Sequence, residues 1–203
     1  MTNSIYNLSK LKELARRLDR ENNYTPCHSE NVANLAMEIC RALNIRGKKK
    51  DMIITACLIH DIGKIAMGPE VLLKHERLSA AESLKIKLHA LISARLAKQA
   101  GLDNAIVETI YYHHVWFNGN GYPDAAYKKG TRIPIGARIM AVCDAYDTMV
   151  SSRAYKEKIP KEEAIKELQK NSIKQFDPKI VEIFIKAVNG GNGGQVSAES
   201  GSA

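Results

Sequence analysis

The sequence lacks a long hydrophobic run. None of its 203 residues belong to an uninterrupted apolar stretch of about 18 residues, so the sequence predicts no membrane-spanning helix. Residues 1–12 are polar and lack the apolar core of a signal peptide. We therefore expect a cytoplasmic protein with no membrane insertion.

Cysteines and aromatic residues are also few. The four cysteines form no C-x-x-C pair, and Cys40, Cys57 and Cys143 lie in apolar runs, so we expect free thiols and no thiolate zinc site. Aromatic residues make up 6% of the chain, and no nucleic-acid-binding motif accompanies the net charge of +8. We expect the lysines on solvated helix faces and no specific nucleic-acid partner.

Strand-like alternation is scarce, and apolar residues recur with the spacing of helices almost throughout. The pattern predicts an all-α fold. Thr25 and Pro26 read as a helix start, a capping hydroxyl followed by a first-turn proline. The other predicted helices cover residues 7–22, about 50–61, 80–100, 103–114, 134–151, 160–171 and 178–188.

One long loop interrupts this helical pattern. Residues 116–132 contain Gly119, Gly121, Pro123 and Gly130, and a loop of this length inside a helical domain is often functional. After residue 188 the composition turns to Gly, Asn, Ser and Ala. We expect residues 189–203 to form a disordered tail outside the fold.

Histidines and aspartates gather at the ends of predicted helices. His60-Asp61 ends the most hydrophobic of them, His113-His114 ends another, and Asp144 falls inside a third. A carboxylate in an apolar helix is costly unless it is paired or bound to a metal. For any single pair, a buried His–Asp hydrogen bond is the simpler explanation. The whole set favours a shared metal centre.

The chemistry of this set narrows the choice of metal and reaction. Imidazoles and carboxylates without thiolates suit iron or manganese, with cobalt, nickel or zinc as alternatives. One aspartate can bridge two ions about 3.5–4 Å apart, and a water held between them ionises near neutral pH. The set therefore predicts two divalent ions and hydrolysis of a phosphodiester.

The order of these motifs resembles the HD-domain superfamily of metal-dependent phosphohydrolases, and within it the HD-GYP group. The superfamily pattern is represented here by His28, by His60-Asp61-Ile62-Gly63-Lys64 and by Asp144. The HD-GYP pattern is represented by His113-His114, Gly119-Asn120-Gly121-Tyr122-Pro123, Asp144-Ala145-Tyr146-Asp147 and Ser152-Arg153-Ala154-Tyr155. The resemblance spans roughly residues 24–184.

The resemblance implies a fold and a reaction. The fold is a compact bundle of antiparallel helices with a Gly-rich loop over residues 24–188, preceded by a helix in residues 1–23 that could be a connector. The reaction is hydrolysis of cyclic di-GMP to pGpG, and in some members onward to GMP. The implied ligands of one ion are His28, His60, Asp61 and Asp144, and those of the second are Asp61, His89, His113 and His114.

The resemblance also assigns roles around the metals. Asp61 and Lys64 would be catalytic. Lys64, Asp147, Arg153 and Lys156 would meet the substrate, with Asp147 either facing it or supporting a ligand. Gly119, Gly121, Tyr122 and Pro123 form the signature loop, where a signalling partner domain could dock.

Four residues depart from the family pattern. Where relatives usually have Glu, Asp and Gly, this chain has Val115, Asn118 and Ser93. Some relatives bind a third metal through a Glu at the position that Tyr24 occupies here. We therefore expect two ions rather than three. The departures leave two alternatives open: a hydrolase of another cyclic dinucleotide or nucleotide, and a weakly active module that senses a nucleotide or docks a partner.

Overall fold

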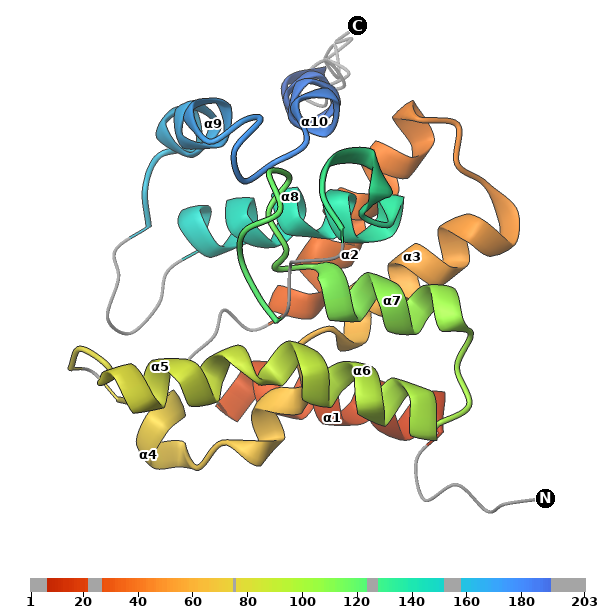
Figure 1. Ribbon diagram of the computed structural model, residues 1–203. Coiled ribbons are helices and arrows are strands. Elements are labelled where there is room, and N and C mark those ends of the chain that lie inside the picture. Colours follow the sequence, from red (N-terminus) through yellow and green to blue (C-terminus); the bar gives the residue numbers. More distant parts are fainter. Residues whose placement is uncertain (1–6, 22–26, 75, 124–127, 152–157, 191–203) are drawn as a thin grey trace, which may run out of the picture.

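The structure, a computed structural model, describes residues 7–21, 27–74, 76–123, 128–151 and 158–190. All regular secondary structure in these ranges is helical, which confirms the predicted all-α fold (Figure 1). The α-helices are α1 (Leu8–Glu21), α2 (His28–Ala42), α3 (Gly47–Ile59), α4 (Pro69–Leu72), α5 (Ala80–Lys87), α6 (His89–Gln99), α7 (Asn104–Tyr112), α8 (Ile135–Val150), α9 (Lys161–Lys170) and α10 (Pro178–Gly190). Two 3-10 helices, η1 (Ile62–Ala66) and η3 (Gly130–Arg132), lie between them.

The helices pack in tiers around one core. α2 packs against both α3 and α8, and α7 packs against α3, α6 and α8. α9 and α10 lie beyond α8, on the side away from α5 and α6 (Figure 1). The core draws fully buried side chains from helices far apart in the chain, among them Ile39, Ile59, Met140 and Phe184. This arrangement brings the ends of α3 and α7 and the starts of α2 and α6 towards α8.

α1 belongs to the same core. Its Leu11 and Ala15 are buried with the residues of α2 and α3. Its Asp19 carboxylate accepts hydrogen bonds from the backbone N–H and the hydroxyl of Ser29, at 2.9 and 3.2 Å, in the first turn of α2. α1 therefore caps the helix that begins with His28. A domain boundary at residue 23 stays a prediction.

Several predicted helix boundaries differ from the observed ones. The predicted helix 80–100 is two helices, divided at Leu88. Next to this break, Nδ1 of His89 is hydrogen-bonded to the backbone carbonyl of Ile86. α2 begins after Cys27, which has φ +79° and makes no side-chain capping bond, while Thr25 and Pro26 lie outside the described residues. α3 begins at Gly47, before the predicted start near residue 50, and α10 continues past residue 188.

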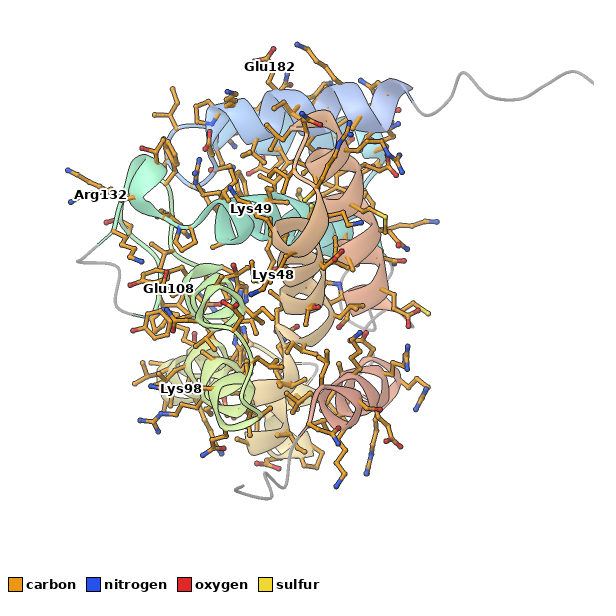
Figure 2. The ribbon with its side chains drawn as sticks, turned by 90° about the vertical axis from the view of Figure 1, so that its right-hand side faces the viewer. Lys48, Lys49, Lys98, Glu108, Arg132 and Glu182 are labelled. Atoms are coloured by element: carbon orange, nitrogen blue, oxygen red, sulfur yellow. The ribbon has the colours of Figure 1, made fainter. Side chains whose placement is uncertain are left out.

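The surface agrees with the expectation of solvated charged faces. Figure 2 shows Lys48 on α3, Lys98 on α6, Glu108 on α7 and Glu182 on α10, so this face carries both signs of charge. No helix in the described part of the chain is long and apolar enough to cross a bilayer. The four cysteines are free thiols, and all of them except Cys27 are buried.

Candidate metal centre

Three histidines are oriented in the same way by the backbone. His60 and His113 follow the last residues of α3 and α7, and His89 begins α6. The Nδ1 atom of each ring lies near the backbone oxygen three residues earlier, at 2.8 Å for His60, 2.7 Å for His89 and 2.5 Å for His113. The carbonyls at helix ends lack intrahelical partners, so they accept these bonds readily. With Nδ1–H donating to a carbonyl, Nε2 keeps its lone pair for a metal.

His28 is oriented by a carboxylate instead. Its Nδ1 atom lies 2.7 Å from Oδ2 of Asp147, and Asp147 is only 4% exposed. The other oxygen of Asp147 accepts hydrogen bonds from Nδ2 of Asn31 at 3.0 Å and from Oγ of Ser151 at 3.2 Å. His28 Nε2 then lies 3.3 Å from Oδ1 of Asp144. Of its two suggested roles, Asp147 is therefore placed for supporting a ligand.

Asp61 lies between the histidines. Its Oδ1 is 3.2 Å from Nε2 of His89, and its Oδ2 is 3.5 Å from Nε2 of His60 and 3.9 Å from Nε2 of His28. The Lys64 ammonium donates to Oδ2 at 2.5 Å. Burial alone would raise the pKa of Asp61, but Lys64 and His60 hold it well below its usual range. Its two oxygens thus face different histidines, as a bridging ligand requires.

The predicted ligands form two groups around Asp61. Within each group the ligand atoms lie within 4.8 Å of one another, and a third group joins the two through Asp61. The first group is His28, His60 and Asp144, the second is His89, His113 and His114, and the joining group is His60, Asp61 and His113. His60 Nε2 is buried and has no hydrogen-bond partner among the described residues, which fits a metal ligand. The structure brings all seven predicted ligands together, and their binding of ions stays a prediction.

The two groups have opposite electrostatics. Burial lowers the pKa of His28, but hydrogen bonds to Asp144 and Asp147 outweigh it and raise the pKa to about 10. Burial would raise the pKa of Asp144, and His28 instead holds it well below its usual range. In the second group burial lowers the pKa of His113 well below its usual range and that of His114 to about 3. In the absence of a metal the first group therefore pairs a protonated His28 with an ionised Asp144, whereas His113 and His114 of the second group are neutral.

The Gly-rich loop covers the second group. The Tyr122 ring packs on the His114 ring, with centroids 4.6 Å apart, and its centroid lies 6.2 Å from that of His89. Gly121 has φ +95°, and a Cβ there would lie 2.2 Å from the His114 carbonyl oxygen, so the close approach requires glycine. The Tyr122–Pro123 peptide is cis. Tyr122 faces the site, and a partner domain at this loop has no support in the described residues.

Two departures from the family pattern are accommodated by the packing. Ser93 is fully buried, and its hydroxyl accepts the Gly63 N–H at 2.8 Å. Ser93 therefore ties α6 to the segment that follows Asp61. Val115 is buried in a small cluster with Ile133, so it contributes apolar packing where the family pattern has a hydrogen-bond acceptor.

A cavity of about 380 Å³ opens at this centre, within the usual size range of small-molecule sites. Asp61, Lys64 and the second group of histidines line it. Its lining also includes Trp116 from the loop and Glu167, Asn171 and Gln175. Sequence reasoning missed these four residues, because only the fold brings residues 167–175 to the same cavity as the histidines. The single Trp of the chain was the one available signal.

Some predicted site residues lie outside the described part of the chain. They are Arg153 and Lys156, expected at the substrate phosphates, Tyr24, at the position of a third-metal ligand, and His75, expected at the surface. These assignments stay predictions.

Comparison with known proteins matches this geometry to a family. The HD domain model matches residues 6–180. The chain is 35% identical over 161 residues to a cyclic di-GMP phosphodiesterase of Thermotoga maritima, covering 78% of this chain and 43% of that protein. It is 28% identical over 175 residues to 3'3'-cGAMP-specific phosphodiesterase 2 of Vibrio cholerae, covering 85% and 33%.

A solved structure agrees at the level of the fold. A cyclic GMP-AMP-specific phosphodiesterase of Vibrio cholerae superposes with a TM-score of 0.69 at 19% identity, covering 90% of this chain and 48% of that one. The chain spans less than half the length of the curated relatives it matches. From its motifs, its family match and its relatives, the chain belongs to the HD domain family and, within it, to the HD-GYP group.

Proposed function

We propose that this chain is a metal-dependent phosphodiesterase that hydrolyses cyclic di-GMP to pGpG, with GMP as the product of a second hydrolysis. The observation that carries the proposal is the position of Asp61, whose two oxygens face different groups of ligands on the wall of a cavity. The relatives named as cyclic di-GMP and cGAMP phosphodiesterases support the substrate class.

The residues fit a pair of divalent ions, with iron and manganese as the first candidates. Such ions, held by the two groups and Asp61, would lower the pKa of a bound water, so that hydroxide is available as the nucleophile. They would also stabilise negative charge on the phosphodiester. The Nδ1 hydrogen bonds of His60, His89 and His113 keep their Nε2 atoms directed at the centre. The Lys64 ammonium lines the cavity beside Asp61, where it can meet a phosphate oxygen as negative charge develops.

A second candidate substrate is 3'3'-cGAMP, because one relative is named for it. Both dinucleotides present the same phosphodiester to the metals. The choice between them therefore falls to the part of the cavity that meets the bases.

Metal content and activity measured on one sample test the proposal. Protein purified without oxygen is analysed for metals and then incubated with cyclic di-GMP, 3'3'-cGAMP and cyclic di-AMP. We expect two ions per chain and formation of pGpG, loss of both after chelation, and recovery when Mn²⁺ is added back. A folded, metal-loaded sample that forms neither pGpG nor GMP overturns the proposal. Tight binding without product would favour a sensing module, and three ions per chain would refute the two-ion site.

A further inference from the structure

The part of the cavity wall that comes from α9 and the turn after it contains polar side chains. Glu167 on α9 and Asn171, which ends that helix, lie one turn apart, and both line the cavity. The Asn171 side-chain amide donates to Oε1 of Glu167 at 2.8 Å and to the Glu167 backbone oxygen at 3.0 Å. The amide therefore holds the carboxylate in place at the mouth of the cavity. Oε2 of Glu167 also lies 3.8 Å from Nζ of Lys170 in an exposed ion pair. A carboxylate can accept about four hydrogen bonds, so Glu167 still has capacity left for a ligand.

This wall is fastened to the Gly-rich loop. The backbone N–H of Phe117 donates to the carbonyl of Gln175 at 2.9 Å, and that of Asn118 donates to the carbonyl of Lys174 at 3.0 Å. These bonds place Trp116 beside the α9–α10 turn, and Lys174 Nζ lies 5.7 Å from the centre of the indole ring. An aromatic plane and a carboxylate are thus joined in one wall.

The charge of the residues that line this wall favours a hydrogen-bond donor over a phosphate. Among the described residues that line the cavity, Lys64 is the one lysine or arginine, and its ammonium is bonded to Asp61. Lys170 and Lys174 lie near Glu167 and Trp116 without lining the cavity, so the carboxylate is the charged group that this wall presents to a ligand. A flat, uncharged ring with N–H donors on its edge fits this wall, because it can stack on the indole and donate to the carboxylate.

Purine bases differ in the edge they would present. Guanine carries two adjacent donors, N1–H and the N2 amino group, and a carboxylate can accept from both. Adenine carries one donor beside the N1 lone pair, which a carboxylate repels. We infer that Trp116 and Glu167, with Asn171 holding the carboxylate, form a base subsite that selects guanine over adenine. This inference rests on the proposed function, because the phosphodiester at the metals sets where the base lies.

A single substitution that keeps the shape of the side chain and removes its charge tests the subsite. Gln at position 167 offers both a donor and an acceptor, which matches the adenine edge better than a carboxylate does. For the Mn²⁺-loaded protein we expect wild type to favour cyclic di-GMP over cyclic di-AMP in kcat/KM. Glu167→Gln should reduce that ratio about tenfold, the worth of a hydrogen bond to a charged group. Glu163→Gln, one turn earlier on α9 and exposed, is the matched control and should leave the ratio unchanged.

The outcomes separate the subsite from the hydrolase. Equal ratios for the two variants, or a wild type without preference between the substrates, would overturn the subsite while the hydrolase stands. If the loaded protein hydrolyses neither substrate, calorimetry measures their binding directly. Cyclic di-GMP binding that is about tenfold weaker in Glu167→Gln than in Glu163→Gln would then keep the subsite and reject the hydrolase. Equal binding, or none, would reject both. Trp116→Ala should weaken both substrates alike, and a change confined to one of them would contradict stacking.

Discussion

Both groups of predicted ligands contain imidazole rings, and they differ in how His28 is held. In the first group the Nδ1 of His28 meets the Asp147 carboxylate, at 2.7 Å. In the second group the Nδ1 atoms of His89 and His113 meet backbone carbonyls at helix ends. The pKa of His28 rises to about 10, whereas burial lowers the pKa values of His113 and His114. The carboxylates beside His28 and the burial of His113 and His114 therefore set the charges of these rings before any metal binds.

This difference predicts unequal affinities. Once His28 has released its proton to bind an ion, the first group contributes the Asp144 carboxylate and is supported by a second carboxylate, so it then offsets more of a divalent charge than the neutral second group does. Asp61 is shared, since one of its oxygens faces each group. We expect the first group to bind its ion more tightly, and the following substitutions test that order.

The largest effect is expected from the shared ligand. Asp61→Asn removes the charge that both groups use, so we expect it to lose both ions and to lower kcat/KM roughly a thousandfold, since metal ions supply several kcal/mol of charge stabilisation. Metal analysis and product formation measure this. Asp51→Asn, at an exposed position of α3, is the control and should retain both ions. If Asp61→Asn kept one ion per chain, the carboxylate would belong to one group only.

The second prediction separates the groups. Asp147→Asn keeps a hydrogen-bond acceptor for His28 but removes the charge. We expect the Mn²⁺ affinity of the first group to fall about 10- to 100-fold, the usual effect of losing a ligand's supporting partner, with no change in the second group. Calorimetric titration of chelator-treated protein resolves the two events. Ser151→Ala removes only one hydrogen bond to Asp147 and should have a smaller effect. Equal weakening of both events would remove the distinction between the groups.

Local signals in the sequence indicated part of the ligand set, and His28 and His89 came from the family resemblance. His60 and His113 follow apolar helices, and a histidine there finds a carbonyl three residues earlier in its own segment. The role of Asp147 needed the fold. Asp144 and Asp147 share a face of α8, and only the packing of α2 on α8 places the His28 ring against both.

Helix boundaries failed where a side chain competes with the backbone. Residues 80–100 have continuous helical periodicity, and the break at Leu88 follows from the His89 ring, which takes the carbonyl of Ile86. The cap of α2 comes from Asp19 on another helix, so no local pattern could indicate it. Ser93 replaces the family's glycine, and its hydroxyl accepts the hydrogen bond from the Gly63 N–H, a role that the sequence did not indicate.

The third prediction concerns the hydrogen bond between Gly63 and Ser93, which ties η1, just after Asp61, to α6, which begins with His89. Ser93→Ala leaves the buried Gly63 N–H without its acceptor, which should cost about 1–3 kcal/mol of stability. For a chain of this size each kcal/mol lowers Tm by about 2–4 °C. Thermal unfolding of the chelator-treated protein measures it, with Ser9→Ala, an exposed position on α1, as the control. An unchanged Tm would mean that the hydroxyl adds nothing to the contact between α6 and η1.

The most gradual effect is expected in the pH dependence of the metal-free protein, and it has opposite signs in the two groups. The pKa of His28 rises on folding from 6.5 to about 10, so its stabilisation is complete below pH 6.5 and is lost as pH rises towards 10. The pKa of His114 falls from 6.5 to about 3, so its contribution is complete above pH 6.5 and is lost as pH falls towards 3.

Urea unfolding of the metal-free protein across this range should therefore show greatest stability near pH 6.5. Each group changes stability by at most about 1.4 kcal/mol per pH unit. Asp147→Asn removes one of the two acids that hold the His28 proton, so it should flatten the alkaline limb and leave the acid limb in place. If Asp147→Asn changed both the acid and the alkaline sides of the stability curve, the two groups would titrate as one unit, and the charge of His28 would not be set independently of that of His114.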